Sequence, residues 1–197
     1  MSLTIIEGKA YPLGLSNVDT DVIIGSDWLK TVSKEGLGNG CFAALREGNE
    51  NVFNDPRYAG AEILVAGANF GCGSSREHAA WALADMGVRA IIASSFSDIF
   101  SSNAFKNGIL AATVDEAAIA PLVEAARDGD LKVDLLQQTV SAGASLEFDF
   151  TIDSFRRRCL IEGLNEIELS LLDAEFIIKH EQRVAGQTPW LARAGTA

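Results

Sequence analysis

The chain has 197 residues, 48% of them hydrophobic, and a formal net charge of −11 at pH 7. That is enough apolar material for one substantial core, and the negative charge argues against nucleic-acid and anionic-membrane partners. No apolar run is long enough for a membrane span and residues 1–13 lack the pattern of a secretory signal, so we expect a cytoplasmic protein.

Cysteine and histidine are too few and too scattered to predict a metal site. Cys41, Cys72 and Cys159 are widely spaced and odd in number, which predicts free thiols and no disulfide framework. The only histidines are His78 and His180. We therefore expect no zinc or iron–sulfur site built by this chain alone.

Short apolar runs alternate with amphipathic runs in the first half of the chain. In order they predict a strand at 62–67, a glycine-rich turn at 69–74, a helix at 76–86, a strand at 89–93 and a helix at 97–107. Gly87 and Gly108 are typical helix stops. Strand, helix and strand in this order predict parallel pairing and an α/β class.

The second half contains further elements and the expected domain boundary. It predicts a helix around 119–126, a strand with one buried face at 146–152, a capped helix at 153–160 and a last helix at 164–180. Pro121 fits poorly inside the first of these and instead suggests a first-turn position. We expect one domain over residues 1–181 and a flexible tail over 182–197.

The glycine-rich turn before the first helix predicts an anion site. Gly71 and Gly73 allow a ligand close to the backbone, and the first-turn amides of a helix point outward. Ser74 and Ser75 add hydroxyl donors, and Arg76 can bind a carboxylate with two parallel hydrogen bonds.

A purely structural alternative exists for the same turn. Ser74 and Glu77 have the Ser-x-x-Glu spacing of a capping box, which stabilises a helix by about 1 kcal/mol. A capping box accounts for neither the second serine nor the arginine, so we favour a functional site while allowing both features together.

Four blocks stand out in chain order: Asn-Val-Asp-Thr-Asp-Val-Ile-Ile at 17–24, Gly-Cys-Gly-Ser-Ser-Arg-Glu-His-Ala at 71–79, Ser-Phe-Ser-Asp-Ile-Phe at 95–100 with Asn103 and Gly108, and Phe-Thr-Ile-Asp-Ser-Phe-Arg-Arg at 150–157 with Gly163. Together they resemble the swivelling domain of the aconitase family in its isopropylmalate dehydratase version. The resemblance covers about residues 7–172. It implies a three-layer β/β/α fold.

The resemblance also implies an activity. Such enzymes are hydro-lyases that isomerise 2-isopropylmalate to 3-isopropylmalate by dehydration and rehydration in leucine biosynthesis, and they work as a small and a large subunit. The large subunit is expected to hold a [4Fe–4S] cluster, and this chain to bind no cofactor. By the family's motif, Ser74 is the base, while Ser75 and Arg76 bind a substrate carboxylate.

Four further residues are candidates for supporting roles. Asp19 and Asp21 can orient an arginine or cap a turn, and the resemblance favours a role facing the site. Cys72 precedes a helix start, a setting in which a thiol can be reactive, although packing in a turn is the simpler interpretation. His78 is expected to form hydrogen bonds around the site.

The segment from Gly25 to Arg46 bears on the identity of the substrate. It is too apolar for an idle loop, and we expect it to close over the substrate or meet the partner. In the family this loop is thought to distinguish an isopropyl substituent from a carboxylate. Gly25 stands where family members usually have proline, residues 35–38 depart from the usual Thr-Gly-Phe-Gly, and Ala111 replaces another proline.

Two alternatives remain open from the sequence. A sister dehydratase of homoaconitate, citramalate or a dimethylmalate would share the catalytic residues and differ within residues 25–46. A stand-alone anion-binding module would use the Gly-Ser-Ser-Arg turn without a cluster or a partner.

Overall fold

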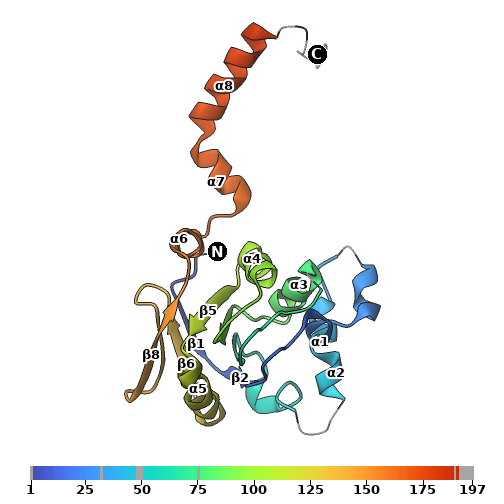
Figure 1. Ribbon diagram of the computed structural model, residues 1–197, viewed down its shortest axis with the longest axis vertical. Helices are drawn as coiled ribbons and strands as arrows, with labels where there is room; N and C mark the ends of the chain where they lie inside the picture. The colour runs from blue at the N-terminus through green and yellow to red at the C-terminus, as the bar shows by residue number, and fades with distance from the viewer. Residues whose placement is uncertain (1, 32, 48–50, 75, 189, 191–197) are drawn as a thin grey trace. The chain divides into compact units, whose positions relative to one another are not determined.

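The computed structural model describes residues 2–31, 33–47, 51–74, 76–188 and 190 (Figure 1). It consists of two compact units, Met1–Gly163 and Leu164–Ala197. In the part of the chain that is described, every helix falls short of the length and apolar content that a membrane crossing requires.

The strands of the first unit are β1 (Ile5–Gly8), β2 (Ala10–Pro12), β3 (Ile63–Val65), β4 (Ala90–Ala93), β5 (Leu110–Val114), β6 (Leu131–Asp134), β7 (Thr139–Ala142) and β8 (Leu146–Thr151). Its helices are α1 (Thr20–Ile23), α2 (Ala43–Arg46), α3 (Glu77–Asp85), α4 (Asp98–Lys106), α5 (Glu116–Asp128) and α6 (Ser154–Glu162), with 3₁₀ turns η1 (Ser26–Lys30), η2 (Leu37–Gly40) and η3 (Pro56–Tyr58).

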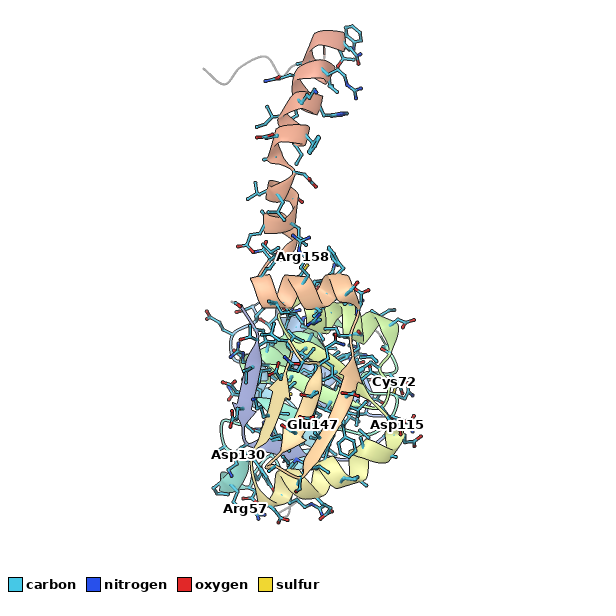
Figure 2. All side chains as sticks on the ribbon, turned by 90° about the vertical axis from the view of Figure 1, so that its left-hand side faces the viewer. Arg57, Cys72, Asp115, Asp130, Glu147 and Arg158 are labelled. Carbon is cyan, nitrogen blue, oxygen red and sulfur yellow. The ribbon has the colours of Figure 1, made fainter. Side chains whose placement is uncertain are left out.

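The strands follow the order β1-β6-β7-β8-β5-β4-β3-β2. Strands β2, β3, β4 and β5 are parallel neighbours, as the alternation of strands and helices predicts. Strands β1, β6, β7 and β8 are antiparallel, and the two parts join where Thr113 of β5 pairs with Thr151 of β8. Figure 2 looks onto the antiparallel strands, where Glu147 of β8 is exposed.

Alternate residues of the parallel strands enter two different cores. Ile63 and Val65 of β3 pack in a cluster with α5 and the antiparallel strands. Leu64 of the same strand packs in a second cluster with α1, α3 and α4, which lie together on one side of the strands in Figure 1. The period-two alternation of a strand sends neighbouring side chains to opposite faces. The fold is therefore layered as β, β and α, which confirms the predicted class.

Helix α5 corrects the expectation about Pro121. Asp115 caps the helix by accepting a hydrogen bond from the amide of Ala117 at 2.9 Å, and Pro121 lies inside it. The buried stripe of the helix, Ile119, Leu122 and their neighbours, outweighs the loss of one backbone hydrogen bond because it fills the core between α5 and the strands.

The second unit differs from the single helix expected over 164–180. It contains α7 (Glu166–Leu172) and α8 (Ala174–Gln187), which meet at Asp173. Asn165 and Glu168 form a capping box at the start of α7, which the apolar spacing alone did not reveal. Helix α8 extends to Gln187, into the stretch from residue 182 onward that was expected to be a flexible tail, and residues 189 and 191–197 lie outside the described part.

Candidate functional site

The glycine-rich loop after β3 meets the loop after β2 at the carboxyl ends of the parallel strands. The amide of Gly71 donates to the carbonyl of Val18 at 2.8 Å, and the amide of Thr20 donates to the carbonyl of Cys72 at 3.0 Å. Carboxyl ends of neighbouring parallel strands share one sheet edge, where binding sites of open α/β sheets usually lie. Two blocks separated by about fifty residues of sequence are thereby brought side by side.

The loop after β4 holds the other side of the same turn. The amide of Phe70 donates to the carbonyl of Ser95 at 3.0 Å, and the amide of Ser97 donates back to the carbonyl of Phe70 at 3.0 Å. The Ser97 hydroxyl also donates to the carbonyl of Gly71 at 2.7 Å. The third family-like block therefore supports the turn instead of contributing a separate site.

Gly71 is required by both its conformation and its surroundings. Its φ is +73°, and a Cβ built on it would lie 2.1 Å from Cγ of Phe100 in α4. No side chain fits there without moving the helix. The close approach of the loop to α4 depends on this glycine.

Ser74 has a fixed backbone and an exposed side chain. Its carbonyl accepts a hydrogen bond from Oγ1 of Thr20 at 2.5 Å, and Thr20 is buried with 1% of its surface exposed. The side chain of Ser74 is exposed. A hydroxyl on a well-held backbone is thus presented to the surface just before α3.

The capping box considered for Ser74 and Glu77 is wrong. Helix α3 begins at Glu77 with Arg76 as its N-cap, and the side chain of Arg76 makes no capping hydrogen bond. The carboxylate of Glu77 instead accepts from Nε1 of Trp81 at 3.1 Å. The Ser-x-x-Glu spacing lies two residues too early, so a structural role as a cap does not account for Ser74.

The two aspartates have different roles: one caps a helix and the other contacts an arginine. Asp19 caps α1, accepting from the amide of Val22 at 2.7 Å. Asp21 reaches Arg76, with 2.5 Å between Oδ1 and Nη1. Nη1 is buried and, although close to Asp21, outside hydrogen-bond geometry. The contact is therefore an ion pair and not a hydrogen bond. Among the described residues, Nη1 of Arg76 has no hydrogen-bond acceptor.

The other candidates occupy different settings. The ring of His78 lies 3.1 Å, measured from Nε2, from the carbonyl of Thr31. Cys72, labelled in Figure 2, is partly buried in the turn, whereas Cys41 and Cys159 are fully buried. Burial raises the pKa of the Cys41 thiol. Ser75 lies outside the described residues.

Sequence reasoning missed Thr20 as a supporting residue. It stands between the two aspartates, and its buried hydroxyl joins the first block to the motif turn. A threonine between two charged residues gives no signal of burial, because the period of the short helix α1 is not readable from four residues. Within the described residues, no three His, Cys, Asp or Glu side chains gather as a metal site would need.

Comparison with known proteins matches this architecture to a class of enzyme domains. A family model described as the aconitase C-terminal domain matches residues 1–117, more than half of the chain. The structure resembles that of 3-isopropylmalate dehydratase (leuD) from Methanocaldococcus jannaschii, with a TM-score of 0.69 and 27% sequence identity over 90% of this chain and 99% of that one. The fold and its site loops are those of an aconitase-type domain.

Relatives with higher identity narrow this class. The 3-isopropylmalate dehydratase small subunit of Erythrobacter litoralis is 54% identical over 96% of this chain and 95% of its own length. That of Zymomonas mobilis is 52% identical over 96% of this chain and 99% of its own length. The chain belongs to the family of 3-isopropylmalate dehydratase small subunits, which confirms the resemblance drawn from the four blocks. Its relatives' designation as small subunits implies a large-subunit partner.

Proposed function

We propose that this chain supplies the proton-transferring part of an isopropylmalate dehydratase site, with Ser74 as base and Arg76 binding a substrate carboxylate. The enzyme is a hydro-lyase that converts 2-isopropylmalate into 3-isopropylmalate, a step of leucine biosynthesis. Family membership supports the reaction. The observation that carries the residue roles is the Arg76–Asp21 ion pair beside an exposed serine on a fixed backbone.

In this proposal Ser74 exchanges a proton with carbon. In the dehydration, the proton on the carbon next to the hydroxyl-bearing carbon moves to Oγ of Ser74 while hydroxide leaves the hydroxyl-bearing carbon, so the acid loses the elements of water. In the rehydration, Oγ returns the proton to the carbon that first carried the hydroxyl, and hydroxide adds to the neighbouring carbon. Serine does not ionise unaided. The N-terminal end of α3 and the guanidinium of Arg76 both favour a negative oxygen, since each places positive charge nearby.

Arg76 is suited to hold a carboxylate because its own guanidinium is held by Asp21. Asp21 contacts Nη1, so the guanidinium is oriented before substrate arrives. The remaining N–H groups form a planar fork that matches the two oxygens of a carboxylate. Ser75 is proposed to bind the same group.

Metal chemistry, in this proposal, belongs to the large subunit. The described residues of this chain lack a set of side chains that fits an iron–sulfur cluster. A [4Fe–4S] cluster on the partner would act as a Lewis acid toward the substrate hydroxyl. The role of this chain is then to bind and orient the acid and to move its proton.

Replacing Ser74 tests the base. The complex of the chain with its large subunit is prepared anaerobically, and formation of the unsaturated product is followed by absorbance. Ser74→Ala should lower kcat at least about a hundredfold, as loss of a general base does. Assembly, measured by size-exclusion chromatography, should not change. Ser145→Ala, at an exposed serine between β7 and β8, is the matched control. Full activity of Ser74→Ala would contradict the proposal.

Replacing Arg76 tests the carboxylate clamp. Arg76→Lys keeps the charge and loses the fork, so KM should rise. Arg158→Lys is the control, because Arg158 is an exposed arginine paired with Glu162 at 3.0 Å. Unchanged KM and kcat in Arg76→Lys would remove this residue from the site.

A panel of acids tests the substrate. Isopropylmalate, citramalate, dimethylmalate and homoaconitate are supplied to the same complex. A preference for isopropylmalate is expected, and a preference for another acid would assign the same chemistry to a sister enzyme.

A further inference from the structure

The segment between α1 and α2 runs along helix α3. We call residues 26–31 and 33–40 the covering segment. At its far end the amide of Gly38 donates to Oδ2 of Asp85, in the last turn of α3, at 2.8 Å. A Cβ at Gly38 would lie 2.7 Å from the backbone nitrogen of Met86, so the two backbones touch. This end of the covering segment is therefore anchored on the C-terminal end of α3.

The middle of the covering segment is tied to the other end of the same helix. Nε2 of His78 lies 3.1 Å from the carbonyl oxygen of Thr31. A carbonyl can only accept, so this nitrogen carries the hydrogen and donates it. A ring nitrogen used as a donor to the backbone does not act as a base. The contact also places Thr31 against the first turn of α3, two residues beyond Arg76.

Side chains complete the attachment. Nζ of Lys34 donates to Oδ1 of Asn107 at the end of α4, at 2.9 Å, and lies 5.1 Å from the centre of the Trp81 ring. The ring of Trp81 lies 4.7 Å from that of His78. His78, Trp81, Lys34 and Asn107 thus form one connected group that joins the covering segment to α3 and α4.

We propose that His78 is a positioning residue that fixes the covering segment over the first turn of α3 and so determines which substituent the substrate can carry. This rests on the proposed function of Arg76. A carboxylate held by Arg76 sets the acid at the start of α3, where Thr31 approaches. The part of the acid not held by Arg76 then faces the covering segment. Losing the His78 contact shifts that surface and leaves Ser74 and Arg76 in place.

The first test compares His78→Ala with His78→Gln in the intact complex. Glutamine retains an N–H donor at similar reach, while alanine has none. His78→Ala should raise KM for isopropylmalate by up to about tenfold, the equivalent of one hydrogen bond, with kcat changed less than about twofold. The preference for isopropylmalate over citramalate, as a ratio of kcat/KM, should fall by a similar factor. His78→Gln should restore both. His180→Ala, in α8, is the control.

The second test does not depend on activity. Trypsin cleaves after lysine, and the exposed Lys30 lies next to Thr31 in the covering segment. The full chain carrying His78→Ala should be cleaved there several times faster than the wild type or His78→Gln, because the segment has lost its tie to α3.

The two tests separate the possible failures. A wild-type complex inactive on every acid of the panel would refute the proposed function, and the cleavage rates would still decide whether His78 holds the covering segment. Unchanged cleavage in His78→Ala would overturn the positioning role. Faster cleavage with an unchanged substrate preference would overturn the specificity role. Equal behaviour of His78→Ala and His78→Gln would show that the donor is not what matters.

Discussion

The motif loop, defined as residues 66–74 and 76, and the covering segment are held in place by different kinds of contact. The motif loop is held by backbone hydrogen bonds from the loops after β2 and β4, with the buried Thr20 beneath Ser74. The contacts of the covering segment with α3 and α4 are largely made by side chains, among them His78 and Lys34. Backbone contacts survive most substitutions, whereas side-chain contacts change with each one. The hydrogen bonds that hold the loop proposed to carry the chemistry therefore depend little on side-chain identity, whereas those that hold the segment proposed to face the substituent depend on it.

The largest effect is expected at Gly71 in the motif loop. Gly71→Ala combines a positive φ with a Cβ 2.1 Å from the Phe100 ring, and should lower the free energy of unfolding by about 2 to 5 kcal/mol. Urea denaturation of the chain measures it. Gly129→Ala, at an extended residue with nothing within 4 Å of the added Cβ, should change little. Equal stability of the two variants would mean that the motif loop accommodates the added methyl group and is not held rigidly.

A smaller effect is expected at Thr20. Thr20→Val keeps the shape but removes the donor to the Ser74 carbonyl, leaving a polar group unpaired, and should cost about 1 to 3 kcal/mol. It should also lower kcat, because Ser74 is no longer held. Thr20→Ser keeps the hydroxyl and should lose less of both. If valine and serine behave alike in denaturation and turnover, the hydroxyl does not support Ser74.

At the end of the covering segment, Cys41 predicts a dependence of stability on pH. Burial raises the pKa of this thiol in the folded protein. Above about pH 8.5 the unfolded chain loses the proton while the folded chain keeps it. Stability should therefore be unaffected by Cys41 below that pH and fall above it, approaching about 1.4 kcal/mol per pH unit.

Denaturation at pH 7.5, 8.5 and 9.5 measures the slope. Cys41→Ala should lose most of the decrease between the last two values, and Cys72→Ala, in the partly buried motif turn, should retain it. A slope that persists in Cys41→Ala would assign it to other groups.

The smallest effect, a gain, is expected just before the covering segment. Gly25 has φ −69° and ψ 158°, a conformation that any residue adopts, and a Cβ there would meet nothing within 4 Å. Gly25→Ala should stabilise the fold by about 0.4 to 1 kcal/mol by restricting the unfolded chain. Gly36→Ala, at φ +84°, should destabilise it. A loss of stability in Gly25→Ala would show that the segment needs freedom at this point.

Much of this architecture could be predicted from the sequence. The strand 62–67, the helix 76–86 and the alternating strand 146–152 all appear within two residues of their expected ends, because buried faces and glycine stops leave periodic signals. The misses have local causes. The burial of the apolar stripe of α5 outweighs the cost of Pro121 inside that helix. The single helix expected near the end of the chain is divided in two at Asp173, which ends α7 and precedes α8.

Residue order and local spacing were enough to identify the family, the α/β class and the stretch that carries Ser74 and Arg76. The folded structure was needed to show that Asp19 caps α1 while Asp21 contacts Arg76, that Thr20 supports the backbone of Ser74, and that His78 contacts Thr31. Each of these contacts, apart from the cap, joins residues about fifty positions apart. The spacing of residues along a chain carries no record of such pairs, because the packing of loops at one sheet edge creates them.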